Sequence, residues 1–393
     1  MALQFQLQKI PEASLRLGRL SLRESAPKTG VARVLETPTF VVTTQRGTVP
    51  HLTADNADQV SPGIVTIFAE HLLEYVPTPI LESDLDGRRF FNIKNDWIIF
   101  DVRDPSKEHK AKDHSKKIYR AETSGGVRQM TLDQYVTLAR KIRPDVLVAL
   151  SDDLNGPMES KDRVQKSVSC TLHWLDQIRE ADTGDMGILA TLKGAHLLDQ
   201  RKHSAEQTAT REAVDGFVLD DLHFAPSAQA QLDWISASVG PLPSAKPRLA
   251  YLIPGPNRVL DSIDKGIDLF DSAYPLQMTD AGQAIAFRFS GPPSTSSEAK
   301  VTPAPAGLDL HDTVFKSDMT PLQAGCSCLT CRKYTRAYVH HLLVTKEMLA
   351  SVLLIVHNLQ TWGDFFAKIR GTLQEGHFSQ AREQFRQSYP DLL

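Results

Sequence analysis

The segment 145–180 places a buried strand directly before an amphipathic helix. It begins with "DVLVALSD" (145–152), an apolar run that ends in acidic residues, and it closes with "KDRVQKSVSCTLHWLDQIRE" (161–180). A run without polar alternation is typical of a parallel strand covered on both faces. In the second part, apolar residues recur at spacings of three and four and share one helix face: Val164, Val168, Leu172, Leu175 and Ile178. The segment therefore predicts a β–α unit.

Seven further runs follow the same pattern: "FVVTTQRG" (40–47), "GIVTIFAEHLL" (63–73), "DWIIFD" (96–101), "MGILATLKG" (186–194), "DGFVLDDL" (215–222), "RLAYLIPG" (248–255) and "GIDLFDSAYP" (266–275). Helix-like segments separate most of them, such as "MTLDQYVTLARKI" (130–142), in which Thr131 is a suitable N-cap. Eight strands that alternate with helices predict an α/β fold, the (β/α)8 TIM barrel, whose chemistry lies on the loops after the strands. A doubly wound sheet is the alternative, but the first strand is not followed by a glycine-rich phosphate loop.

The composition is that of an ordinary globular protein. The chain has 393 residues, of which 41% are hydrophobic and 23% charged, and its net charge is −3. This charge argues against a generally basic nucleic-acid binder but leaves room for a local basic patch. No apolar run approaches the ~20 residues that span a bilayer, and the first 22 residues lack the pattern of a secretory signal. We therefore expect a cytoplasmic protein.

Two stretches interrupt the alternation. "DPSKEHKAKDHSKKIYR" (104–120) is basic and forms either a solvated loop or a patch that contacts RNA phosphates through Lys107, Lys110, Lys112, Lys116 and Lys117. "SGPPSTSSEAKVTPAPAG" (290–307) is rich in proline and serine and is expected to be a flexible insertion. The expected organisation is a barrel body (1–289), this insertion, and a metal-binding C-terminal segment (308–393) that completes the barrel.

The chain concentrates three of its four cysteines within six positions, at Cys326, Cys328 and Cys331. This spacing can place three thiolates around one ion, and Gly325 permits a sharp approach to the loop. Zinc prefers four tetrahedral thiolate and imidazole ligands, and a closed set of four is structural rather than catalytic. We therefore expect one structural Zn²⁺ per chain. The candidates for the fourth ligand are His340, His341 and His357.

The cysteine region carries a resemblance to a known family. "GCSCLTCRKYTRAYVHHL" (325–342), followed by "VHNL" (356–359), resembles the zinc region of the tRNA-guanine transglycosylases. These are (β/α)8-barrel proteins that exchange guanine at the anticodon wobble position 34 of tRNA for queuine or a precursor. The resemblance implies that His357 is the fourth zinc ligand and leaves His340 and His341 to helix packing or the surface. It extends to residues 36–53, 266–275 and 312–328, and thus covers most of the chain.

The residues that carry the family's reaction are largely replaced. The family uses one aspartate as nucleophile and another as general acid and base, and these positions fall on Asp271 and Asp101. The Cys-Val-x-Pro-Thr-Arg pattern after the nucleophile is replaced by residues 272–277. "FDVRDPS" (100–106) lacks the glycines and glutamine of the general-base motif, and its Arg103 and Pro105 would crowd the ligand.

The loops that read the base have diverged as well. "GILATLKG" (187–194) lacks the family's glutamine, and Asp220 and Asp221 stand where two glycines admit the ligand. Asp152 keeps a base-binding carboxylate position, although a helix or loop cap explains it equally well. We therefore expect Asp101 and Asp271 to be degenerate positions rather than catalytic residues.

The resemblance then implies a non-catalytic subunit that forms a heterodimer with a catalytic queuine tRNA-ribosyltransferase subunit and meets tRNA through that complex. It also implies a peripheral association with the mitochondrial outer membrane. Two alternatives remain. One is an active transglycosylase that uses Asp271 as nucleophile and Asp101 as general base. The other is a zinc-stapled barrel with an unrelated binding role.

Overall fold

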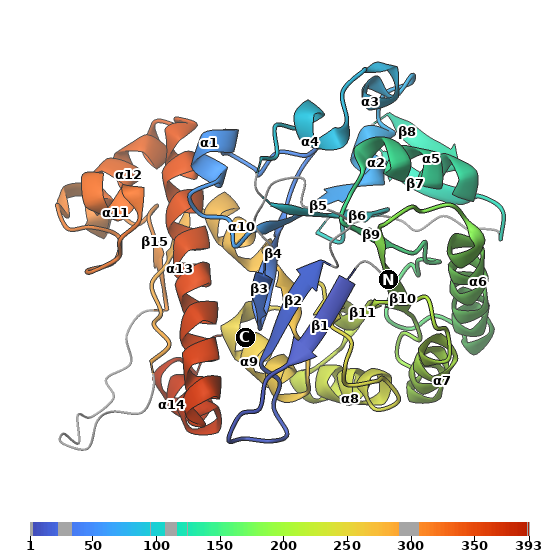
Figure 1. The fold of residues 1–393 in the computed structure, drawn as a ribbon. Coiled ribbons are helices and arrows are strands. Elements are labelled where there is room, and N and C mark those ends of the chain that lie inside the picture. Colours follow the sequence, from blue (N-terminus) through green and yellow to red (C-terminus); the bar gives the residue numbers. More distant parts are fainter. Residues whose placement is uncertain are drawn as a thin grey trace.

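The computed structural model describes residues 3–22, 34–94, 96–106, 116–123, 125–290, 306–390 and 392. Within them, eight parallel strands close into a barrel with helices around it (Figure 1). In barrel order the strands are β4 (Thr39–Thr43), β5 (Ile64–Phe68), β6 (Trp97–Asp101), β9 (Val146–Val148), β10 (Gly187–Leu192), β11 (Gly216–Leu219), β12 (Arg248–Ala250) and β13 (Leu269–Asp271). Seven of these strands lie inside the predicted apolar runs, and β4 begins one residue before its run, so the predicted (β/α)8 barrel is confirmed.

Burial on both faces explains why these strands are apolar without alternation. In β4, Phe40 and Val42 pack in the cluster between the barrel and its outer layer, whereas Val41 packs with the residues of the barrel interior. Each of these side chains is removed from water, so every position favours an apolar residue. The pairing of β13 with β4, in which Asp271 lies opposite Val41, closes the barrel.

The helices between the strands form the outer layer of the barrel (Figure 1). The predicted cap of α5 is confirmed, because Thr131 and Gln134 form a capping box at its start. The helix predicted over 161–180 is also confirmed as α6. The outer helices are α5 (Leu132–Ile142), α6 (Lys161–Glu180), α7 (Leu198–Ala209), α8 (Ala228–Val239), α9 (Gly255–Asp264) and α10 (Ala273–Asp280).

An antiparallel sheet closes the amino end of the barrel. It consists of β1 (Leu3–Leu7), β2 (Gly18–Leu22) and β3 (Val34–Thr37), and its buried leucines join the interior cluster of the barrel. The buried Arg16 donates to both carboxylate oxygens of Asp268, at 2.8 and 3.0 Å. Asp268 therefore has a structural role.

The C-terminal segment packs a helical layer on one side of the barrel. Its elements are β14 (Gln283–Ile285), β15 (Gly307–Asp309), α11 (Leu329–Lys333), α12 (Arg336–Val344), α13 (Leu349–Glu375) and α14 (Phe378–Ser388). The long helix α13 contacts β4, α10, α11 and β14, so it joins the barrel to the cysteine region. Most of the predicted insertion, residues 291–305, lies outside the described residues, and the division into three parts stays a prediction.

Among the described helices, none combines the length and the apolar character needed to cross a bilayer.

Candidate functional site

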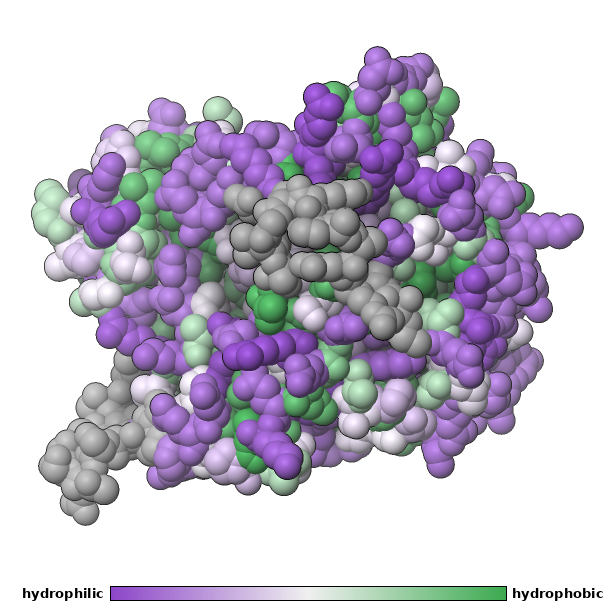
Figure 2. All heavy atoms as spheres, in the orientation of Figure 1, coloured by the Kyte–Doolittle hydropathy of each residue, from purple (hydrophilic) through white to green (hydrophobic). Residues whose placement is uncertain are grey.

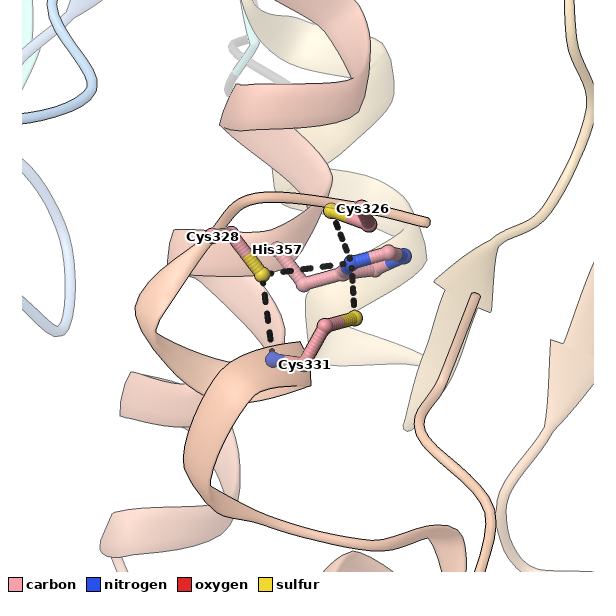
Figure 3. Close-up of side chains that lie close together, drawn as sticks. All are labelled: Cys326, Cys328, Cys331 and His357. Carbon is pink, nitrogen blue, oxygen red and sulfur yellow. Dashed lines mark hydrogen bonds between the residues drawn. The ribbon is translucent and has the colours of Figure 1, made fainter. Parts of the chain in front are cut away.

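The predicted ligands Cys326, Cys328, Cys331 and His357 converge on one point. Figure 3 shows the three sulfurs around the Nδ1 atom of His357, at distances of 3.7, 3.6 and 3.3 Å in chain order. Tetrahedral zinc with ordinary Zn–S and Zn–N bonds requires a sulfur–nitrogen separation of about 3.6 Å. All four ligand atoms lie within 4.8 Å of one another. The cluster therefore has the geometry and the donor atoms of a closed tetrahedral metal site.

The loop that carries the cysteines is held from both sides. Gly325 has a φ of +75°, which allows the sharp turn expected before Cys326. The side-chain amide of Gln323 donates to the carbonyl oxygens of Ala286 and Phe287, at 3.0 and 3.3 Å. At the start of α11, the backbone N–H of Cys331 donates to the sulfur of Cys328 at 3.3 Å, which favours a thiolate there. The cysteine loop is thus preformed for a cation.

The two alternative histidines do not join the cluster. His340 is buried, and its Nδ1 donates to the carbonyl oxygen of Leu310 at 2.8 Å. His341 is exposed on α12. This matches the packing and surface positions that the resemblance implied.

At the carboxyl end of the barrel, Asp271 is occupied by backbone groups. Its carboxylate accepts from Leu252 N–H at 2.8 Å and from Ala273 N–H at 3.2 Å, and the side chain is buried. Burial raises the pKa of Asp271 to about 6. A nucleophile must approach a ribose carbon, whereas this carboxylate ties β13 to the turn before α10. The contacts are those of a structural cap.

Asp101, at the end of β6, is also enclosed by protein. It accepts from Tyr251 O–H at 2.9 Å and from the N–H of Val102 at 2.6 Å. Burial raises the pKa of Asp101 to about 7, and the nearby Asp220 and Asp153 add to the rise. This carboxylate therefore faces a tyrosine of the barrel interior rather than an open cleft.

A buried lysine lies at the barrel mouth, after β10 and between the aspartates that follow β9 and β11. The ammonium of Lys193 contacts Asp220 at 2.6 Å, Asp221 at 3.1 Å and Asp153 at 3.5 Å. Arg103 lies 3.4 Å from Asp153 and adds a second cation. Burial opposes the charge of Lys193, but the three aspartates raise its pKa, so it stays protonated. The two aspartates that replace the family's glycines are thus held by this lysine.

Lys193 and Asp153 were missed by the sequence analysis. The available signal was charge complementarity, because Lys193 ends one apolar run and the Asp220–Asp221 pair ends the next. Adjacent parallel strands bring such ends together at one rim of the barrel.

Asp152 is engaged by the following helix. Arg163 donates two hydrogen bonds to its carboxylate, at 2.8 and 3.0 Å. Such a bidentate pair fixes the carboxylate. Asp152 therefore holds the start of α6 through an ion pair, whereas the N-cap of that helix is Ser160.

The cavity beside Asp101 and Asp220, at the mouth of the barrel, is too small for a nucleobase. The cavity lined by Asp101, Arg103, Pro105, Asp220 and Tyr251 has a volume of about 20 Å³. On this measure one ordered water needs roughly 10–15 Å³, whereas small-molecule pockets measure roughly 300–1,000 Å³. Arg103 and Pro105, which we predicted to crowd the ligand, both line this cavity.

A second group of possible ligands, Glu70, His71 and Asp104, is buried near the same rim. The N–H of Arg46 donates to Nδ1 of His71 at 3.3 Å, so the proton of a neutral ring is on Nε2, which lies 3.3 Å from Asp104. A protonated ring nitrogen is not a metal ligand. The arrangement is that of a histidine–carboxylate pair.

Comparison with known proteins decides the family. The family described as queuine tRNA-ribosyltransferase matches residues 12–391. The chain belongs to the queuine tRNA-ribosyltransferase family. Its relatives include three proteins named queuine tRNA-ribosyltransferase accessory subunit 2. The Xenopus tropicalis protein is 31% identical over 90% of this chain and 93% of its own length. The Homo sapiens protein is 29% identical (94% and 95%), and the Anopheles gambiae protein is 32% identical (94% and 86%).

This member of the queuine tRNA-ribosyltransferase family therefore combines the family barrel with a filled mouth. The four predicted metal ligands meet, whereas the two positions expected for catalytic aspartates are bound by neighbouring protein groups. Membership also removes the alternative of an unrelated zinc-stapled barrel.

The raised pKa of Asp101 predicts a pH-dependent stability. In the unfolded chain an aspartate has a pKa of about 3.9, so the folded state holds this proton more tightly. The contribution of this proton to the free energy of unfolding is fully present below pH 4 and is lost as the pH rises through 7. We expect Asp101→Asn to change the free energy of unfolding more favourably at pH 8 than at pH 5. The difference between the two effects should be on the order of 2 kcal/mol.

Chemical unfolding at both pH values measures this difference. Asp176→Asn is the control, because Arg211 lowers the pKa of Asp176 and its carboxylate is ionised at both pH values. An Asp101→Asn effect that is equal at pH 5 and pH 8 would contradict the prediction.

Proposed function

We propose that this chain is the non-catalytic subunit of a heterodimeric queuine tRNA-ribosyltransferase, which exchanges guanine for queuine at position 34 of tRNA. The observation that carries the proposal is the filled barrel mouth, with its cavity of about 20 Å³. A chain that keeps the family fold but has no room for the base can still contribute through its surfaces, by binding other molecules. The names of its relatives, each an accessory subunit, support the same function.

The alternative is an active transglycosylase with Asp271 as nucleophile and Asp101 as general base. It would require both carboxylates to leave their partners and the Lys193 cluster to open. Removing a lysine from three buried carboxylates is costly, because it leaves uncompensated charge away from water. The geometry therefore favours the non-catalytic subunit.

The surface proposed for the catalytic partner lies on the C-terminal segment. Apolar side chains are exposed there: Val314, Met319, Tyr338, Val344, Met348 and Leu349. Figure 2 shows apolar residues among polar ones on the side of the molecule where α11 and α12 lie. Exposed apolar patches mark interaction sites, and a diverged copy of a symmetric dimer inherits its half of the interface. We call this set the partner surface.

We further propose that the Cys326, Cys328, Cys331 and His357 cluster binds one structural zinc ion per chain. The match of its spacing to tetrahedral zinc supports this. The ion would join the cysteine loop to α13, beneath the partner surface. The expected location is the cytoplasm, with peripheral association at the mitochondrial outer membrane.

We predict that the basic stretch contacts tRNA within the assembled complex. Of its lysines, Lys116 and Lys117 are exposed, while Lys107, Lys110 and Lys112 lie outside the described residues. Reversing the five charges should weaken binding of the complex to tRNA and flatten its dependence on salt, because each lost phosphate contact lowers the slope by about 0.9 or less. The isolated chain, with a net charge of −3, should bind tRNA weakly or not at all.

Filter binding across a salt series measures both quantities, and a variant with the exposed Lys202 and Lys265 reversed is the control. An unaltered slope in the five-lysine variant would place the RNA contacts elsewhere.

The pairing itself is tested by co-purification. A tagged form of this chain, expressed with a catalytic family member, should retain that partner at a ratio of one to one through size-exclusion chromatography. Two separate peaks at micromolar concentration would exclude a stable heterodimer.

A further inference from the structure

Two consecutive residues of α13 bind the same residue of β14. The Nε2–H of His357 donates to the carbonyl oxygen of Ile285 at 2.8 Å. The N–H of Ile285 in turn donates to Oδ1 of Asn358 at 2.8 Å. Both backbone groups of Ile285 are therefore held by one turn of the helix that carries the fourth ligand of the metal cluster.

The amide of Asn358 has one orientation only. Its Nδ2 donates to Oγ1 of Thr279 at 2.9 Å and to the carbonyl oxygen of Gln283 at 3.0 Å, so Oδ1 must face Ile285. Thr279 cannot reverse this arrangement, because its own hydroxyl proton goes to the carbonyl oxygen of Pro275 at 2.8 Å. Asn358 and Thr279 are both buried. The side chain is thus locked between α10 and β14.

This lock determines which nitrogen of His357 is free for a metal. Asn358 holds the backbone N–H of Ile285 and thereby the position of that residue. The carbonyl oxygen of Ile285 therefore stays in line with Nε2 and keeps the ring proton there. The lone pair of Nδ1 then points at the three sulfurs, at 3.3–3.7 Å. Partners of this kind, one bond beyond the ligand, orient a metal-binding histidine and raise its basicity.

We propose that Asn358 is a positioning residue for the metal ion. Together with His357 it binds both backbone groups of Ile285, and we call this metal-dependent arrangement the clasp. The proposal rests on zinc occupying the cysteine–histidine cluster. By thermodynamic reciprocity, a side chain that strengthens zinc binding is itself made more stabilising by zinc. Zinc therefore tightens the attachment of β14 and α10, the elements that follow the last barrel strand.

The test measures zinc affinity by competition with a chromophoric chelator. We expect Asn358→Ala to bind zinc about 10- to 100-fold more weakly than the unaltered chain. Thr279→Val removes one of the three bonds of the Asn358 amide without altering α13, and should weaken binding several-fold. Thr372→Val is the matched control, because it deletes a buried hydroxyl from the same helix, where that hydroxyl donates to the Ile369 carbonyl oxygen.

A second measurement separates positioning from general support of the fold. The loss in the free energy of unfolding in Asn358→Ala should be larger with zinc bound than after chelation, and the difference should equal the free energy that corresponds to the fold-loss of zinc affinity. An equal loss in both forms, with a zinc affinity within twofold of the unaltered chain, would overturn the proposal. If Asn358→Ala does not fold, an unchanged affinity of Thr279→Val overturns it.

Absence of zinc from the unaltered chain would also overturn the clasp, but it would leave the filled barrel mouth and the proposed pairing untouched. Failure of the clasp is therefore distinguishable from failure of the proposed function.

Discussion

Cys328→Ser is expected to reduce the zinc content from one ion per chain to nearly none. Serine can still cap the start of α11, so the variant removes a thiolate while keeping the local turn. Because a structural metal supplies folding energy, we expect a loss on the order of 5 kcal/mol, seen as a melting temperature lower by roughly 6 °C. His357→Ala should behave in the same way, since Nδ1 lies 3.3–3.7 Å from the three sulfurs, at the position of the fourth ligand atom.

Cys170→Ser is the control for this experiment. Cys170 is the remaining cysteine and lies buried in α6, outside the cluster. Its replacement should cost about 1–3 kcal/mol for the buried hydroxyl and leave the zinc content at one. Metal analysis of protein purified without chelators decides the question. A full zinc content in Cys328→Ser or His357→Ala would show that the ligand set is wrong.

Charges placed on the partner surface are expected to abolish the activity of the complex. The double variant Val344→Asp, Met348→Asp converts two exposed apolar side chains to carboxylates, one on the last residue of α12 and one on the residue before α13. Burying unpaired charge in an interface costs several kcal/mol, and a loss of about 2.7 kcal/mol weakens binding 100-fold. The pair should therefore separate at micromolar concentration, and base exchange should fall at least 100-fold.

Leu198→Asp controls for the added charge, because Leu198 is also exposed but lies on α7, across the barrel from α12 (Figure 1). It should leave pairing and exchange unaltered. A double variant that still forms the complex would move the interface away from the C-terminal segment.

The barrel was predictable because each of its strands is locally distinctive. Residues such as Phe40, Val41 and Val42 are all buried, on alternate faces, so the apolar runs mark the strands directly. The predicted helix cap at Thr131 acts over three residues and is equally local. The metal ligands were predictable for two reasons, the tight spacing of the cysteines and the family resemblance that selected His357.

The side chains that fill the barrel mouth could be identified only from the structure. The loss of glycines predicted crowding, but the pairing of Lys193 with Asp153 and Asp220 joins residues 40 and 27 positions apart. The amino-terminal sheet was also missed. Its strand β1 has the pattern "LQFQL", in which only Leu3 is buried, and so short a pattern does not distinguish a strand from a loop. Both features depend on contacts that only the closed barrel creates.

Base exchange by the separated and combined subunits tests the central claim most directly. Labelled guanine or queuine is supplied with tRNA to this chain alone, to its complex with the catalytic subunit, and to the complex that carries Asp271→Asn in this chain. Because Asp271 caps backbone groups and the cavity beside Asp101 and Asp220 has a volume of only about 20 Å³, we predict no incorporation by the chain alone. We predict nearly equal rates for the two complexes. Incorporation by the isolated chain that disappears in its Asp271→Asn variant would contradict the claim and establish an active transglycosylase.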